Sequence, residues 1–146
     1  MMSNFKPQRR RLASASTPPG SETLFAEKPW RLSTPACAYR PAGRMGDVGP
    51  LPAQTNGAVT FGTLTRTIRI NHRSVRVWSE ILNRVRGARL VVNSTSFGEP
   101  AMCARLAAEF AAHGIERGRL LLGYDTPPWN VMRSIDIGLD CFPHNS

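Results

Sequence analysis

The chain has 146 residues, of which 41% are hydrophobic and 20% charged, a length that suits a single domain. No apolar run approaches the roughly 20 residues of a membrane span, and heptads, Gly-X-Y triplets and internal repeats are absent, which excludes a transmembrane protein, a coiled coil, collagen and a repeat array. Nineteen Lys and Arg against ten Asp and Glu give a net charge of +9, which suits a nucleic acid, an acidic membrane surface or a phosphorylated ligand as partner.

The number and spacing of the cysteines bear on the cellular compartment of the protein and on whether it binds zinc. Cys37, Cys103 and Cys141 form no CxxC pair and have no histidine at zinc-ligand spacing. An odd number of isolated cysteines argues against a disulfide scaffold and against a zinc site. Reduced thiols, together with an N-terminus that has no apolar signal region, predict a cytoplasmic protein without a metal cofactor.

The composition of the chain changes near residue 56. Residues 1–20 are basic and rich in Ser and Pro, and they are predicted to form a disordered tail. Residues 21–55 carry scattered apolar residues between prolines, which is typical of an extended lead-in segment packed on a larger body. The remaining residues, 56–146, have the regular patterns of a folded domain.

The first folded elements of that domain are a strand and a helix. The apolar, β-rich run 58–63 ends in Gly-Thr and predicts a strand. Asn71 is suited to cap a helix over 72–86, and the helix ends before Gly87. Its apolar residues recur at three- and four-residue intervals, so one face is buried. The run 89–92 predicts a second strand.

The same alternation continues to the end of the chain. Pro100 opens a helix over 100–113, residues 119–122 predict a third strand, Pro127 and Pro128 open a short helix, and 137–140 predict a fourth strand. Strands that alternate with helices predict an α/β fold with a parallel sheet of about four strands. This is half of a Rossmann-like, doubly wound domain, with both faces of its apolar strands covered.

Ligands of such sheets bind beyond the carboxyl ends of the strands, so the loops 63–71, 93–99, 123–128 and 141–146 are expected to form the site. The first loop places Arg66 and Arg69 just before a helix N-terminus, where free amides, the helix dipole and guanidinium groups favour a phosphate. A solvated basic loop is the alternative interpretation. The sequence has no P-loop, no dinucleotide fingerprint and no Ser–His–Asp set, so no catalytic residue is assigned.

A second functional hypothesis comes from arginine. Residues 66–89 contain seven Arg, which would suit a basic nucleic-acid-binding or adaptor module. The alternatives are the outer face of an amphipathic helix and a bias in the base composition of the gene. Nucleic acid is the less favoured partner, because no aromatic residues alternate with these arginines to stack on bases.

Several motifs resemble one known family. They are Val-Thr-Phe-Gly-Thr at 59–63, Arg-Ile-Asn at 69–71, Val-Trp-Ser-Glu-Ile-Leu at 77–82, Gly-Glu-Pro at 98–100, Gly-Ile-Glu-Arg-Gly-Arg-Leu at 114–120 and Ile-Asp-Ile-Gly-Leu-Asp-Cys-Phe-Pro-His-Asn at 135–145. In this order they are similar to the start of the carboxyl-terminal catalytic lobe of the O-linked N-acetylglucosamine transferase/SPINDLY family. The similarity covers about residues 22–146, and the last block is its most specific part.

This resemblance implies a fold and an activity. Members of the family have two Rossmann-like lobes in the GT-B arrangement, with the active site between them and no metal. They transfer N-acetylglucosamine or a related sugar, such as fucose, from a UDP- or GDP-sugar to Ser or Thr hydroxyls of an acceptor protein. The acceptor hydroxyl attacks the anomeric carbon, and cations stabilise the departing diphosphate.

The resemblance also assigns candidate donor-site residues. Arg69 lies where the family has a cation on the donor phosphates, usually Lys, and Arg66 lies where it usually has Gln. The nucleotide would be bound near Asn93, Ser94, Tyr124, Asp125 and Thr126. His144 and Asn145 would lie at the edge next to the sugar or diphosphate.

The departures from the family lead to a further expectation. The chain has no match to the tetratricopeptide repeats or to the amino-terminal lobe, and it stops at Ser146, where the family continues into a diphosphate-binding segment. The sequence therefore predicts a truncated lobe with an exposed sheet edge, inactive alone unless another chain supplies the missing lobe.

Overall fold

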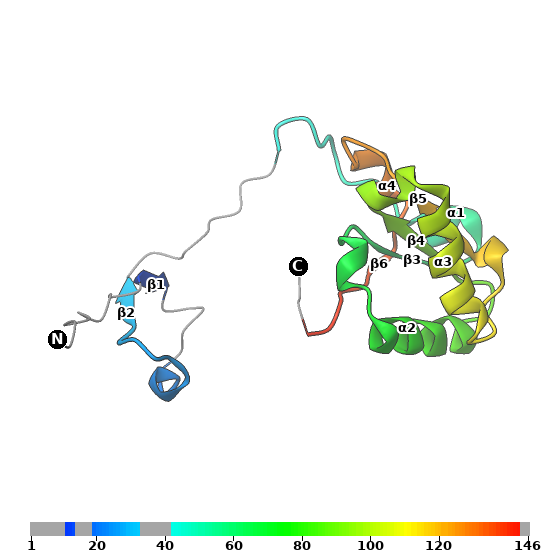
Figure 1. The fold of residues 1–146 in the computed structure, drawn as a ribbon. Coiled ribbons are helices and arrows are strands. Elements are labelled where there is room, and N and C mark those ends of the chain that lie inside the picture. Colours follow the sequence, from blue (N-terminus) through cyan, green and yellow to red (C-terminus); the bar gives the residue numbers. More distant parts are fainter. Residues whose placement is uncertain (1–10, 14–18, 33–41, 144–146) are drawn as a thin grey trace. The chain divides into compact units, whose positions relative to one another are not determined.

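The computed structural model describes residues 11–13, 19–32 and 42–143 and divides the chain into two compact units, Met1–Met45 and Gly46–Ser146 (Figure 1). In the first unit, β1 (Arg11–Ala13) pairs in parallel with β2 (Trp30–Leu32), and η1 (Glu22–Leu24) lies between them in sequence. The predicted disordered tail falls mostly on residues 1–10 and 14–18, which lie outside the described residues, as do residues 33–41 of the lead-in segment.

The second unit contains the predicted alternation of strands and helices. Its elements are α1 (Pro52–Asn56), β3 (Thr60–Thr63), η2 (Thr67–Arg69), α2 (His72–Arg84), β4 (Arg89–Asn93), η3 (Thr95–Gly98), α3 (Pro100–Ala111), η4 (Arg117–Arg119), β5 (Leu120–Gly123), α4 (Trp129–Arg133) and β6 (Ile137–Gly138). The strands are all parallel, in the order β5-β4-β3-β6. This confirms the predicted α/β fold. None of the helices in the described ranges is long and apolar enough to cross a membrane.

Two side chains define the ends of α2. The Asn71 Oδ1 accepts hydrogen bonds from the amides of Arg73 and Ser74, at 3.0 and 3.1 Å, which confirms Asn71 as the N-cap. At the other end, the Arg119 guanidinium donates to the carbonyl oxygens of Leu82 and Ala88, at 2.6 and 2.8 Å. Arg119 comes from the segment before β5, so the fold itself supplies the partner for the last carbonyls of the helix.

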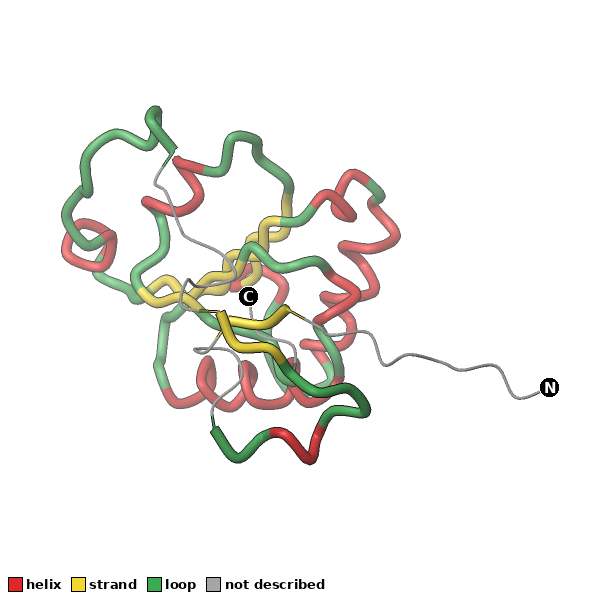
Figure 2. Tube along the Cα trace, turned by 90° about the vertical axis from the view of Figure 1, so that its left-hand side faces the viewer, coloured by secondary structure: helices red, strands yellow, loops and turns green. Residues whose placement is uncertain are grey.

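The core is formed by side chains of the sheet and of the helix pair α2 and α3. Figure 1 labels these elements, and Figure 2 shows the same strands and helices from the side. Because side chains alternate along a strand, Leu90, Val92 and Leu120 share one face of the sheet, and all three are buried. Leu82 of α2 and Phe110 of α3 are fully buried in the same cluster. The apolar stripes predicted for the two helices therefore pack on the sheet.

The opposite face of the sheet differs from the expectation that both faces are covered. Val91 and Leu121 are paired in register there, and Leu121 is 47% exposed. The helix that follows β5, α4, has five residues, whereas α2 has 13 and α3 has 12. A helix of little more than one turn cannot cover a four-stranded sheet, which leaves part of this face open.

The boundary between the two units lies after Met45, earlier than the predicted change near residue 56. Helix α1 lies in the segment for which an extended chain is predicted; it begins with Pro52 and ends at Gly57 in a left-handed conformation. The Asp136 carboxylate accepts hydrogen bonds from the amides of Ala53 and Thr60, each at 2.8 Å. This carboxylate joins α1 to the start of β3, so α1 belongs to the second unit.

Candidate functional site

A cavity of about 310 Å³ lies at the carboxyl edge of the sheet, between the segments that follow β3, β4 and β5. Its lining residues are Leu64, Thr65, Arg66, Asn93, Ser94, Thr95, Tyr124, Asp125, Thr126 and Pro128. They include one of the two predicted phosphate-binding arginines and every predicted nucleotide-binding residue. Residues far apart in sequence thus share a single cavity, because parallel strands end at the same edge of a sheet.

The other predicted site residues do not line this cavity. Arg69 is exposed at the end of η2, and its charge acts on the Cys141 thiol. The turn of η2, closed by the Arg69 amide bonded to the Arg66 carbonyl at 2.9 Å, separates the two arginines along the edge. His144 and Asn145 lie outside the described residues.

Asn93 shapes the wall of the cavity. Its Oδ1 accepts a hydrogen bond from the Asp125 amide at 2.7 Å, and its Nδ2 donates to the Asp125 carbonyl at 3.1 Å. The Asn93 side chain is 7% exposed. The contact of Asn93 with the nucleotide stays a prediction. The structure shows this amide bonded to the loop after β5, which it holds beside the end of β4.

The loop that Asn93 holds presents accessible side chains. Tyr124 is 52% exposed, and Asp125 and Thr126 are exposed as well. In the segments that follow β3 and β4, the Thr67 hydroxyl donates to the Ser96 hydroxyl at 2.8 Å and joins η2 to η3. The walls are therefore fixed by hydrogen bonds, while aromatic, carboxylate and guanidinium groups remain open to a ligand.

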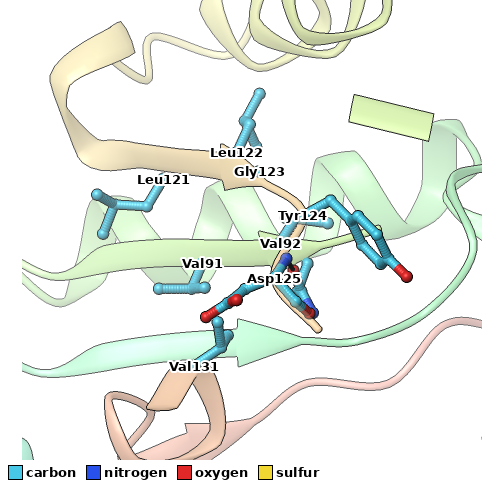
Figure 3. A pocket seen from close by; sticks show the side chains of 9 residues that line it. Val91, Val92, Leu121, Leu122, Gly123, Tyr124, Asp125 and Val131 are labelled. Atoms are coloured by element: carbon cyan, nitrogen blue, oxygen red, sulfur yellow. Dashed lines mark hydrogen bonds between the residues drawn. The ribbon is translucent and has the colours of Figure 1, made fainter. Parts of the chain in front are cut away.

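A second, apolar cavity of about 320 Å³ adjoins the first (Figure 3). It lies on the α4 face of the sheet, where Val91, Leu121 and Val131 gather, and Tyr124 and Asp125 border both cavities. The sequence analysis did not identify this cavity. The pattern that could have revealed it is the alternation of side chains along β4 and β5, which places Val91 and Leu121 on the face opposite α2 and α3.

The N-terminus of α2 differs from the sequence-based expectation of free amides. The Arg73 and Ser74 amides are bonded to the Asn71 side chain, and the Val75 amide is bonded to the Asn71 carbonyl. These donors are therefore not available to a phosphate. The attraction of an anion to this edge comes from the guanidinium groups of the preceding segment and from the helix dipole.

Cys141 is buried near Arg69, in the basic segment that contains Arg66 and Arg69, and 1% of its surface is exposed. Burial raises the pKa of its thiol, and the neighbouring hydroxyls of Thr65 and Ser74 oppose this rise. A buried thiol with a raised pKa is a poor nucleophile, and Cys141 belongs to the packed core cluster. Within the described residues, no group of three His, Cys, Asp or Glu side chains is placed to hold a metal ion.

No family model matches the chain. Over 137 residues it is 32% identical to the probable UDP-N-acetylglucosamine–peptide N-acetylglucosaminyltransferase SPINDLY of Petunia hybrida, which covers 90% of this chain and 14% of that protein. The Arabidopsis thaliana protein of the same description is 30% identical over 135 residues, covering 90% of this chain and 15% of its own length.

Among solved structures, a mutant O-GlcNAc transferase from Thermobaculum terrenum is 26% identical and superposes with a TM-score of 0.80, covering 94% of this chain and 26% of that chain. An open parallel sheet with a cavity at its carboxyl edge is typical of a Rossmann-like α/β fold, and the likeness to the solved transferase assigns it to the GT-B type. The chain belongs to the O-linked N-acetylglucosamine transferase/SPINDLY family, as its motifs predicted. It spans about one seventh of the length of the curated relatives that it matches.

Proposed function

We propose that the cavity at the carboxyl edge binds a nucleoside diphosphate sugar, and that the chain forms part of the donor site of a protein O-glycosyltransferase. The donor is a UDP- or GDP-sugar, with N-acetylglucosamine or a related sugar as the transferred group and Ser or Thr hydroxyls as acceptors. One observation carries this proposal: Arg66, Asn93 and Tyr124, from the carboxyl ends of three different strands, line the same cavity. The relatives are described as peptide N-acetylglucosaminyltransferases, which supports the same reaction class.

The cavity offers suitable partners for the diphosphate and for the base of a nucleotide. The Arg66 guanidinium can form two parallel hydrogen bonds to a diphosphate, and Arg69 adds a second positive charge at the same edge. The half-exposed ring of Tyr124 provides a face against which a base can pack. In the transfer reaction, charge develops on the departing diphosphate, and the two arginines would stabilise it.

The chain alone is proposed to bind the donor without transferring its sugar. It covers 14% of its Petunia relative and 26% of the solved transferase, so residues outside it would supply the acceptor contacts and the rest of the active site. Those residues belong either to a longer polypeptide or to a separate chain. The cytoplasmic location stays a prediction from the cysteines.

The test is a titration of the labelled chain with UDP and with GDP, followed by amide NMR. Binding should shift the amides of Arg66, Tyr124 and Asp125. Arg66→Met should weaken binding of the preferred diphosphate by about tenfold or more, since it removes a charge-assisted contact, and should leave the affinity for the free nucleoside unchanged. Arg84→Met, at the far end of α2, removes an arginine that is exposed as Arg66 is, and it is the matched control.

Two results would contradict the proposal. One is that neither diphosphate shifts the cavity amides of the folded chain. The other is that Arg66→Met and Arg84→Met weaken binding equally, since the loss would then reflect net charge alone. An RNA oligonucleotide that binds with a steep salt dependence, without any response to UDP or GDP, would instead support a basic nucleic-acid-binding surface.

A further inference from the structure

A single side chain, that of Asn71, connects two segments at the phosphate end of the site, which is the part of the carboxyl edge that carries Arg66 and Arg69. Its Oδ1 accepts the amides of Arg73 and Ser74 at the start of α2. Its Nδ2 donates to the Phe142 carbonyl, at 2.5 Å, in the segment that follows β6. The N-cap of α2 is therefore also a link to a part of the chain that lies 71 residues further along the sequence.

The segment after β6 is held through its backbone and through the Cys141 side chain. The Leu139 amide donates to the Gly62 carbonyl at 2.7 Å, and the Cys141 side chain is buried. Beyond this point the Phe142 ring is 65% exposed, so apolar packing contributes little to its position. The bond from Asn71 to the Phe142 carbonyl is therefore well placed to set the direction in which the chain leaves the sheet.

We propose that Asn71 is a positioning residue of the donor site, which holds the segment after β6 against the basic segment that contains Arg66 and Arg69. This inference rests on the proposed function and deepens it, because Asn71 follows Arg66 and Arg69 in the segment after β3 and bonds that segment to the segment after β6. This role needs a short side chain that accepts hydrogen bonds from the α2 amides and also donates one to the Phe142 carbonyl. The amide group of Asn can do both. Ser and Asp cap helices equally well, but neither carries an N–H at this reach.

Two substitutions separate positioning from capping. Asn71→Ser keeps a neutral oxygen for the cap and loses the longer N–H arm to the Phe142 carbonyl. Asn71→Asp keeps the cap as well, cannot donate, and brings a negative charge close to the phosphate end. Asn83→Ser is the matched control, because Asn83 also lies on α2 and its Nδ2 also donates to a backbone carbonyl, that of His113, at 3.2 Å.

The experiment measures amide hydrogen exchange of the full chain, without ligand and with saturating UDP or GDP, whichever binds. In Asn71→Ser, exchange at residues 139–142 should become about three to ten times faster, as expected for one lost hydrogen bond, while residues 73–75 stay within about twofold. The ligand should slow exchange at 139–142 in the unsubstituted protein and should lose this effect in Asn71→Ser. The dissociation constant should rise by about the same three- to tenfold.

The outcomes are distinguishable. Unchanged exchange at 139–142 in Asn71→Ser, or an equal effect of Asn83→Ser, overturns the positioning role. Equal loss of protection at 73–75 and 139–142 means that Asn71 acts only as a helix cap. If Asn71→Asp weakens binding of the diphosphate and Asn71→Ser does not, the added negative charge, and not the position of the segment after β6, is responsible for the loss. If the unsubstituted chain binds neither diphosphate, the proposed function fails, and ligand-free exchange still decides whether Asn71 holds the segment.

Discussion

The wall of the candidate donor cavity depends on two hydrogen bonds from Asn93, so Asn93→Ala is a sharp test of how the cavity is built. The substitution removes the acceptor of the Asp125 amide, at 2.7 Å, and the donor to the Asp125 carbonyl, at 3.1 Å. Each bond contributes about 1 kcal/mol net. We therefore expect the free energy of unfolding to fall by about 2 kcal/mol, and the loop 124–126 to lose its fixed position beside β4.

Urea denaturation measures this change, with the buried Trp78 as a fluorescent probe of the core. Asn83→Ala is the control, since its single bond of 3.2 Å is exposed, and we expect a change within about 0.5 kcal/mol. The amide shifts of Tyr124 and Asp125 report the loop directly. A free energy of unfolding for Asn93→Ala within about 0.5 kcal/mol of the unsubstituted protein would refute the reasoning, because water would then replace both bonds at no cost.

Two further predictions concern the core and the buried thiol. Gly62→Ala would place a Cβ 2.3 Å from the Ile135 Cδ1, so we expect a loss of about 1–3 kcal/mol in urea unfolding; Gly118→Ala, with open space around it, is the control, and equal effects would refute the contact. Burial raises the pKa of the Cys141 thiol, so the unfolded chain loses this proton at lower pH than the folded one. The contribution of this thiol to the free energy of unfolding should therefore be constant below about pH 8.5 and should fall as the pH rises above it. Cys141→Ala should flatten this fall and Cys103→Ala should not; if both variants keep it, another group is responsible.

Much of the fold could be predicted from local patterns. The strand and helix alternation, the parallel sheet and the Asn71 cap were all confirmed. These features depend on neighbours within a few residues, since a cap acts on the next turn and a buried helix face repeats every three or four positions. Helix α1 was missed because the segment was interpreted from its prolines, whereas Pro52 is well tolerated in the first turn of a helix.

The donor site was only partly predictable. The rule that ligands bind at the carboxyl edge indicated the correct loops, and the structure brings Arg66, Asn93 and Tyr124 into one cavity there. The sequence did not show that the Asn93 amide is already bonded to Asp125, or that the Arg73 and Ser74 amides of α2 are bonded to the Asn71 side chain. Hydrogen bonds between distant loops depend on distances that no local pattern contains.

The sequence by itself determined the class of the protein, its family and the edge of the sheet where a ligand would bind. Periodicity, capping residues and short motifs each involve residues that are close together in the sequence, so they can be recognised without the folded structure. The tertiary structure decided which polar groups remain available. It placed Arg119 at the end of α2, Asn71 against Phe142, and Arg69 outside the cavity that Arg66 lines. A side chain's partner is whichever group the packed elements bring within about 3 Å, and only the folded chain sets that distance.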